Sequence, residues 1–77
     1  MAMARVTVKS ANGRYVVTLT GHFSGRSLRR LEQACAPALE QRPLPLTLQL
    51  APSCTFDELA RLYLDRLVAC GALLVFP

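Results

Sequence analysis

The apolar residues of this chain follow two different periods, and the order in which these periods alternate limits what the chain can fold into. In four segments they recur at every second position or without a break, as in β-strands. These segments are 5–9, 15–20, 44–50 and 72–76. In two others they recur at every third or fourth position, as in a helix with one apolar face. These are 24–39 and 55–70. The sequence therefore predicts the element order ββαβαβ.

Turn residues indicate how these elements connect. The pair Asn12-Gly13 between the first two strands favours the tight turn of an antiparallel hairpin. Each later strand is reached through a helix, and such connections join parallel strands by a right-handed crossover. We therefore predict an α/β domain with a mixed four-stranded sheet, in which 44–50 and 72–76 lie side by side in the same direction and both helices cover one face. The unbroken apolar run of 72–76 predicts a strand covered on both faces.

The helix ends carry sequence signals of their own. Ser24 or Ser27 can cap the first helix, and 40–43 follow its end. Thr55 and Glu58 have the spacing of a capping box at the start of the second helix, and Gly71 is placed to end it. The apolar face of this helix is predicted from Phe56, Leu59, Leu62, Tyr63, Leu67 and Cys70.

Composition narrows the class of protein. The chain has 77 residues, 52% of them apolar, and a net charge of +4. A single domain of this size, 1–77, buries a thin core, so a partner or a second copy would add stability. No apolar run reaches the ~20 residues that a membrane span needs, and the first residues lack the apolar centre of a secretory signal. We therefore expect a cytoplasmic protein without membrane insertion.

The cysteines do not form a recognisable site. Cys35, Cys54 and Cys70 are odd in number and lack the spacing of a disulfide framework or a zinc site, so we expect most of them to be reduced and buried. No spacing in the chain implies a metal, nucleotide or organic cofactor.

Several stretches resemble the STAS domain, the family of anti-sigma-factor antagonists and sulfate transporters. The run 15–23, followed by an amphipathic helix, is similar to the family's opening strand and helix. The runs 46–50, 55–60 and 71–75 resemble its later strand, loop, helix, glycine and strand. The resemblance spans about 5–76 and implies a STAS-like fold that works by binding a protein.

Three positions depart from the family's pattern. Gln49 stands where the family has a strand-end aspartate. Asp57 matches the aspartate before the regulatory serine or threonine, but Glu58 stands at the acceptor position itself and Ala60 replaces a glycine. The resemblance therefore implies a degenerate, truncated STAS-like domain without a phosphorylatable switch, whose Glu58 carboxylate could imitate the charged state.

The candidate partner-binding residues lie around the starts of the two predicted helices. They are His22, Ser24, Arg26, Arg29, Arg30, Thr55, Asp57, Glu58 and Arg61. Two plainer interpretations stay open: the residues around Asp57 can simply cap a helix, and the arginines can form a solvated face. His22 has no Ser or Cys at the spacing of a catalytic triad, so we expect no catalytic residue.

These observations favour a non-enzymatic protein-interaction module, either an anti-sigma-factor-antagonist-like regulator or an accessory subunit. The alternative is a structural subunit of a larger complex or a homo-oligomer, joined through the uncovered sheet face or the edge of 72–76, because unpaired strand edges recruit further strands. A small nucleic-acid-binding domain is less favoured, since the basic residues come without clustered lysines or an aromatic platform.

Overall fold

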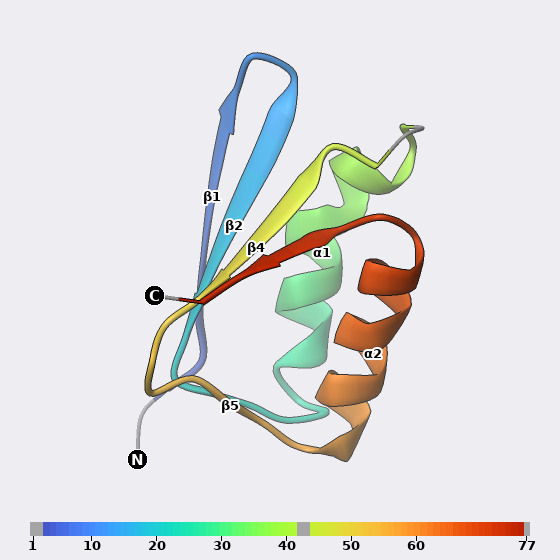
Figure 1. The fold of residues 1–77 in the computed structure, drawn as a ribbon. Helices are drawn as coiled ribbons and strands as arrows, with labels where there is room; N and C mark the ends of the chain where they lie inside the picture. Colours follow the sequence, from blue (N-terminus) through green and yellow to red (C-terminus); the bar gives the residue numbers. More distant parts are fainter. Residues whose placement is uncertain (1–2, 42–43, 77) are drawn as a thin grey trace.

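The computed structural model describes residues 3–41 and 44–76, which form a sheet with two helices on one of its faces (Figure 1). The elements are β1 (Arg5–Ala11), β2 (Arg14–Thr20), β3 (His22–Phe23), α1 (Leu28–Leu39), β4 (Leu46–Leu50), β5 (Thr55–Phe56), α2 (Glu58–Ala69) and β6 (Leu73–Val75). The main sheet has four strands in the order β1-β2-β4-β6, and β3 and β5 form a separate two-stranded sheet. The predicted α/β class with two helices and a mixed four-stranded sheet is confirmed, whereas the sequence does not predict the small second sheet.

Strand directions follow the predicted connections. β1 and β2 are antiparallel, and Asn12 and Gly13 take the left-handed conformation at the turn between them, with φ of 54° and 78°. β4 runs parallel to β2 on one side and to β6 on the other, so the predicted parallel alignment of the last two main strands is confirmed. Pro45 lacks an N–H, but its carbonyl oxygen accepts a hydrogen bond from the Tyr15 N–H at 2.8 Å.

The core fills the space between the sheet and the helices. Val17 and Leu19 of β2 lie opposite Leu48 and Leu50 of β4, and all four are at most 6% exposed. The helices contribute Leu31, Cys35, Ala38, Ala60, Leu64 and Leu67. On the other face of the sheet the described side chains are more polar, and the Thr18 hydroxyl donates to Gln49 Oε1 at 3.3 Å. The sheet is therefore packed on one face only.

The last strand differs from the prediction. Leu73, Leu74 and Val75 are 56%, 37% and 40% exposed, so β6 is covered on neither face. The physical reason is its place at the edge of the sheet, where one neighbouring strand is missing and α2 extends over only part of it. Within the run 72–76 only Ala72 is buried, and the other four residues are exposed.

The buried face of α2 also differs from the prediction. Of the predicted residues, Leu67 is buried and Phe56 and Tyr63 pack against the core, as expected. Leu59 and Leu62 are instead 60% and 55% exposed and Cys70 is exposed, while Ala60 and Leu64 are buried. Both sets of residues have helical spacing, so the apolar period alone does not decide which set is buried. Each helix has 12 residues, and within the described part of the chain no helix is long and apolar enough to cross a membrane.

The three thiols differ strongly in exposure, which corrects the expectation that most are buried. Cys35 is buried, Cys54 is half-buried and Cys70 is exposed, and all three are free. Burial raises the pKa of the Cys35 thiol to about 11. Because the thiolate is the reactive form, Cys35 should be the least reactive of the three.

We expect alkylation at about pH 8 to modify Cys70 first, Cys54 more slowly and Cys35 only after unfolding. Mass spectrometry of peptides over a labelling time course measures this order. Rapid labelling of Cys35 in the folded protein would contradict the described core.

Gly21, between β2 and β3, offers a sharper test of the fold. Its φ is +85°, and an added Cβ would collide with the backbone carbonyl of Met3. Gly13 has a similar φ of +78° but open space around it. We expect Gly13→Ala to lower the free energy of unfolding by about 1–2 kcal/mol for the backbone conformation alone. Gly21→Ala should cost at least about 1 kcal/mol more, because it also overpacks. Urea denaturation compares the two, and equal losses would show that Met3 does not lie against Gly21.

Candidate protein-docking site

The small sheet brings the starts of the two helices together. β3 precedes α1, β5 precedes α2, and the two strands pair in parallel, with His22 opposite Thr55 and Phe23 opposite Phe56. Two backbone hydrogen bonds hold the pair: the Thr55 N–H donates to the Gly21 carbonyl at 2.9 Å, and the Asp57 N–H donates to the Phe23 carbonyl at 2.8 Å. The two loops therefore form one continuous surface at the end of the sheet where β2 and β4 finish (Figure 1).

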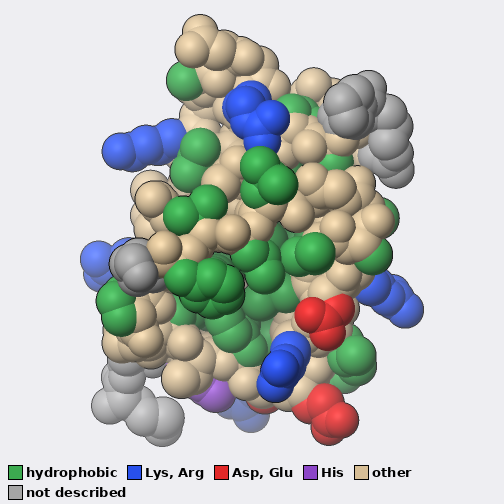
Figure 2. All heavy atoms as spheres, viewed as in Figure 1, with side chains coloured by type: hydrophobic (Ala, Val, Ile, Leu, Met, Phe, Trp, Pro, Cys, Tyr) green, Lys and Arg blue, Asp and Glu red, His purple; other side chains and the backbone are tan. Residues whose placement is uncertain are grey.

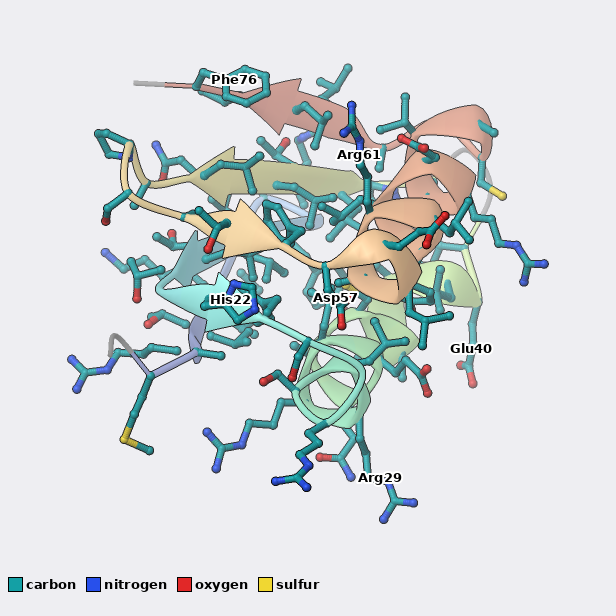
Figure 3. All side chains as sticks on the ribbon, turned by 90° about the horizontal axis from the view of Figure 1, so that it is seen from below. His22, Arg29, Glu40, Asp57, Arg61 and Phe76 are labelled. Carbon is teal, nitrogen blue, oxygen red and sulfur yellow. The ribbon has the colours of Figure 1, made fainter. Side chains whose placement is uncertain are left out.

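Asp57 ties the two helix starts to each other through its side chain. Its Oδ1 accepts a hydrogen bond from the Ala60 N–H, and its Oδ2 accepts one from the Gly25 N–H, both at 2.9 Å. The first bond caps α2, and the second reaches the loop before α1. The Ala60 N–H, with the Gly25 N–H and the nearby His22, lowers the pKa of this carboxyl below its usual value. Figure 3 shows Asp57 between the two helix starts.

The predicted capping box is wrong in its residues. The N-cap of α2 is Asp57, not Thr55, and Glu58 is the first helical residue. Thr55 instead lies in β5, where its hydroxyl is 2.7 Å from the His22 imidazole Nδ1. The reason is that Thr55 and Phe56 form a strand paired with β3, which the sequence does not predict, so the helix starts after them. At α1, Ser27 occupies the N-cap position but makes no side-chain capping hydrogen bond.

Two stacked phenylalanines hold β3 and β5 together. The rings of Phe23 and Phe56 are stacked, with centroids 5.6 Å apart and planes inclined by 23°. Phe23 is fully buried and Phe56 is half-buried. Offset aromatic pairs add about 0.5–1.5 kcal/mol beyond the area they bury, so the pair fixes the spacing of β3 and β5.

The structure gathers some of the predicted site residues and separates others. His22 is joined to Thr55, Asp57 is joined to Gly25 in the loop before α1, and Glu58 follows Asp57 as the first residue of α2. Ser24 is half-buried, and Arg26 and Arg29 are exposed near the start of α1. Arg30 is turned toward the N-terminal segment, where its guanidinium donates to the Ala4 carbonyl at 3.4 Å. Arg61 lies on the other flank of α2, near Phe76 and away from Arg29 (Figure 3).

Sequence reasoning missed three residues that hold this surface together. They are Phe23, Phe56 and Gly25. The repeated pattern of a polar residue followed by Phe, at 22–23 and again at 55–56, is the signal that could have revealed the pairing. The role of Gly25 rests on its backbone N–H, so no side-chain pattern indicates it.

The arrangement has limited chemistry of its own. A hydroxyl beside an imidazole is the pairing of nucleophile and base found in catalytic triads, in which a third group orients the imidazole. The side-chain hydrogen bonds within the described residues join His22 only to Thr55. Residues 3–41 and 44–76 also contain no group of three or more His, Cys, Asp or Glu side chains arranged to hold a metal ion.

Comparison of the chain with known protein families, with curated proteins and with solved structures finds no match in any of the three.

Substitution of Asp57 tests the link between the helix starts. Asn keeps an acceptor for the Ala60 N–H but places an NH₂ group against the Gly25 N–H, whereas Ala removes both acceptors. We expect the melting temperature at pH 7 to fall in the order wild type, Asp57→Asn, Asp57→Ala. Equal melting temperatures for wild type and Asp57→Ala would show that the carboxylate does not link the two helix starts.

The same carboxyl predicts a pH dependence. Because its folded pKa lies below the unfolded value of about 3.9, its stabilising effect is complete above that value and is lost as pH falls through the lower folded pKa. The difference in stability between wild type and Asp57→Asn should therefore shrink as pH is lowered through this window. A constant difference from pH 7 to about pH 2 would contradict the assignment.

Proposed function

We propose that this chain is a non-enzymatic protein-interaction module of the STAS type, which docks a partner protein on the surface formed by the starts of α1 and α2. The observation that carries the proposal is the double hydrogen bond of Asp57, which holds two helix starts as one rigid surface. The resembled family binds its partners at the corresponding place. A cytoplasmic location belongs to this proposal and agrees with the three free thiols.

Charge gives the partner a chemical description. The first turn of α1 has no acidic residue, and Arg26, Arg29 and Arg30 lie at or near it. The positive end of the helix dipole disfavours cations there, so these arginines do not serve helix stability. A partner with an acidic surface would neutralise both the dipole and the guanidinium groups, and we propose such a surface.

Glu58 supplies the opposite charge beside the arginines. It is exposed in the first turn of α2, whereas both Asp57 oxygens are already bound to backbone N–H groups. Its carboxylate is the charge available to a partner at this position, so we propose that the acidic partner surface carries a basic group opposite Glu58. In the resembled family the phosphate acceptor stands here, so we propose a docking surface whose charge does not depend on phosphorylation.

Nucleic-acid binding has less to support it. Arg5 is the first residue of β1 and Arg14 is the first residue of β2, and both could contact phosphates. The aromatic side chain on β2, Tyr15, packs against the core instead of lying on the open face of the sheet. That face therefore offers no stacking platform from β2.

Partner capture from the native host, with the full chain as bait and mass spectrometry as readout, tests the proposal. We expect the double variant Arg29→Glu/Glu58→Lys to lose at least about tenfold of the captured partner, because each reversal places like charges together. The matched control is Glu32→Lys/Arg66→Glu, which makes the same charge changes away from the helix starts. Circular dichroism should show both variants folded. Equal capture by the two folded variants would exclude this surface.

A further inference from the structure

A second surface, which adjoins the helix-start surface at β5, is an apolar hollow beside the edge strand. It has a volume of about 780 Å³, and its lining includes Leu50, Phe56, Leu64, Leu74, Phe76 and the flank of α2 at Arg61 and Asp65. In Figure 2 apolar side chains gather in the middle of this face, with basic and acidic side chains close together below them. Phe76 is 68% exposed, which is unusual for a side chain of this size.

β6 is only three residues long, which limits pairing at a strand edge, but these residues include no charge and no proline. Native edge strands carry charges, prolines or bulges that discourage further pairing. Leu73, Leu74 and Val75 are all apolar, so β6 presents apolar side chains on both faces and an unpaired backbone edge. At the opposite edge of the sheet, β1 carries Arg5 and Lys9.

We infer that β6 pairs antiparallel with β6 of a second copy of this chain, about a two-fold axis that passes near Leu74. Such an axis is perpendicular to the sheet, so the two sheets become one and all helices stay on the same face. Leu74 then meets its own equivalent on the helix side, and Leu73 lies opposite Val75 of the second copy on the open side. Every cross-strand pair formed in this way is apolar.

The helices fit the same symmetry. Strands lie ~4.8 Å apart, so helices that each cover a β4–β6 pair on either side of the new seam would have axes about 10 Å apart, within the usual packing distance. The Ala72 N–H donates to the Leu67 carbonyl at 2.9 Å, which places the start of β6 level with that residue. Two strand residues span about the same length as four helix residues. Leu74, two residues after Ala72, therefore lies level with the part of α2 near Tyr63, four residues before Leu67.

The charges on the flank of α2 complement themselves about this axis. Arg61 and Asp65 lie two residues on either side of Tyr63. An antiparallel pair of α2 helices therefore sets Arg61 of each copy opposite Asp65 of the other. The two copies together would form two such ion pairs. This complementarity favours a second copy over a chain of different sequence.

Sedimentation equilibrium of the full chain, from about 1 µM to about 1 mM, tests the inference. We expect a monomer–dimer equilibrium. Arg61→Asp, which sets two carboxylates against each other, should raise its dissociation constant at least about tenfold. The swap Arg61→Asp/Asp65→Arg should restore dimerisation, and the control Arg66→Asp on another face of α2 should not change it. A monomer throughout this range, or a dimer indifferent to Arg61→Asp, would overturn the inference.

A covalent measurement tests the position of the axis independently. In a Cys70→Ser background, Leu74→Cys should give a disulfide-linked dimer under mild oxidation, because residues at the axis come within disulfide distance of each other. Thr7→Cys on β1 is the matched control and should stay monomeric. Equal crosslinking of both variants would overturn the assigned geometry. Arg29 and Glu58 are unchanged in these variants, so the result does not depend on the proposed docking site.

Discussion

The parallel pairing of β2 with β4 is the constraint on which the rest of the structure depends. Parallel strands end at the same edge of a sheet, so the chain leaves both strands at one end of the molecule. The pairing then continues beyond the main sheet, first where the Ala51 N–H donates to the Leu19 carbonyl and then through β3 and β5. Both helices must therefore start next to each other. The proposed docking surface is thus a consequence of strand direction, and the hydrogen bonds of Asp57 hold together the helix starts that this direction brings side by side.

The two proposed binding surfaces meet at β5 but are compatible because the residues proposed to bind, Arg29 and Glu58 on one and Leu74 and Arg61 on the other, are different. The helix starts lie at the end of the sheet, and the self-association surface lies along its β6 edge. Arg61 belongs to the second surface, although sequence reasoning grouped it with the first. A thin core gains stability from covering its exposed apolar edge, while the charged helix starts remain free for a partner. The module would then present two equivalent docking surfaces per dimer.

Sequence predicted the four strands of the main sheet and the two helices, in their order, because apolar period and turn chemistry are local properties. The hairpin at Asn12-Gly13 and the end of α2 at Gly71 follow from backbone conformations that few residues adopt, with Gly71 at a φ of 111°. The burial of β6 and the facing of α2 were not predictable in this way. Whether Leu59 or Leu64 faces the core depends on where α2 starts, and that start depends on the pairing of β5 with the distant β3. Asp57 was identified as part of the site, but its bond to Gly25 exists only in the folded chain.

Nuclear Overhauser contacts in the isotope-labelled chain test most directly whether the two helix starts form one surface. The account predicts contacts between the rings of Phe23 and Phe56, together with a contact between the Gly25 amide proton and the β-protons of Asp57. A spectrum that shows the β2–β4 pairing but neither of these contacts would contradict it. In that case the loops would separate beyond the main sheet, and the helix starts would be two independent surfaces.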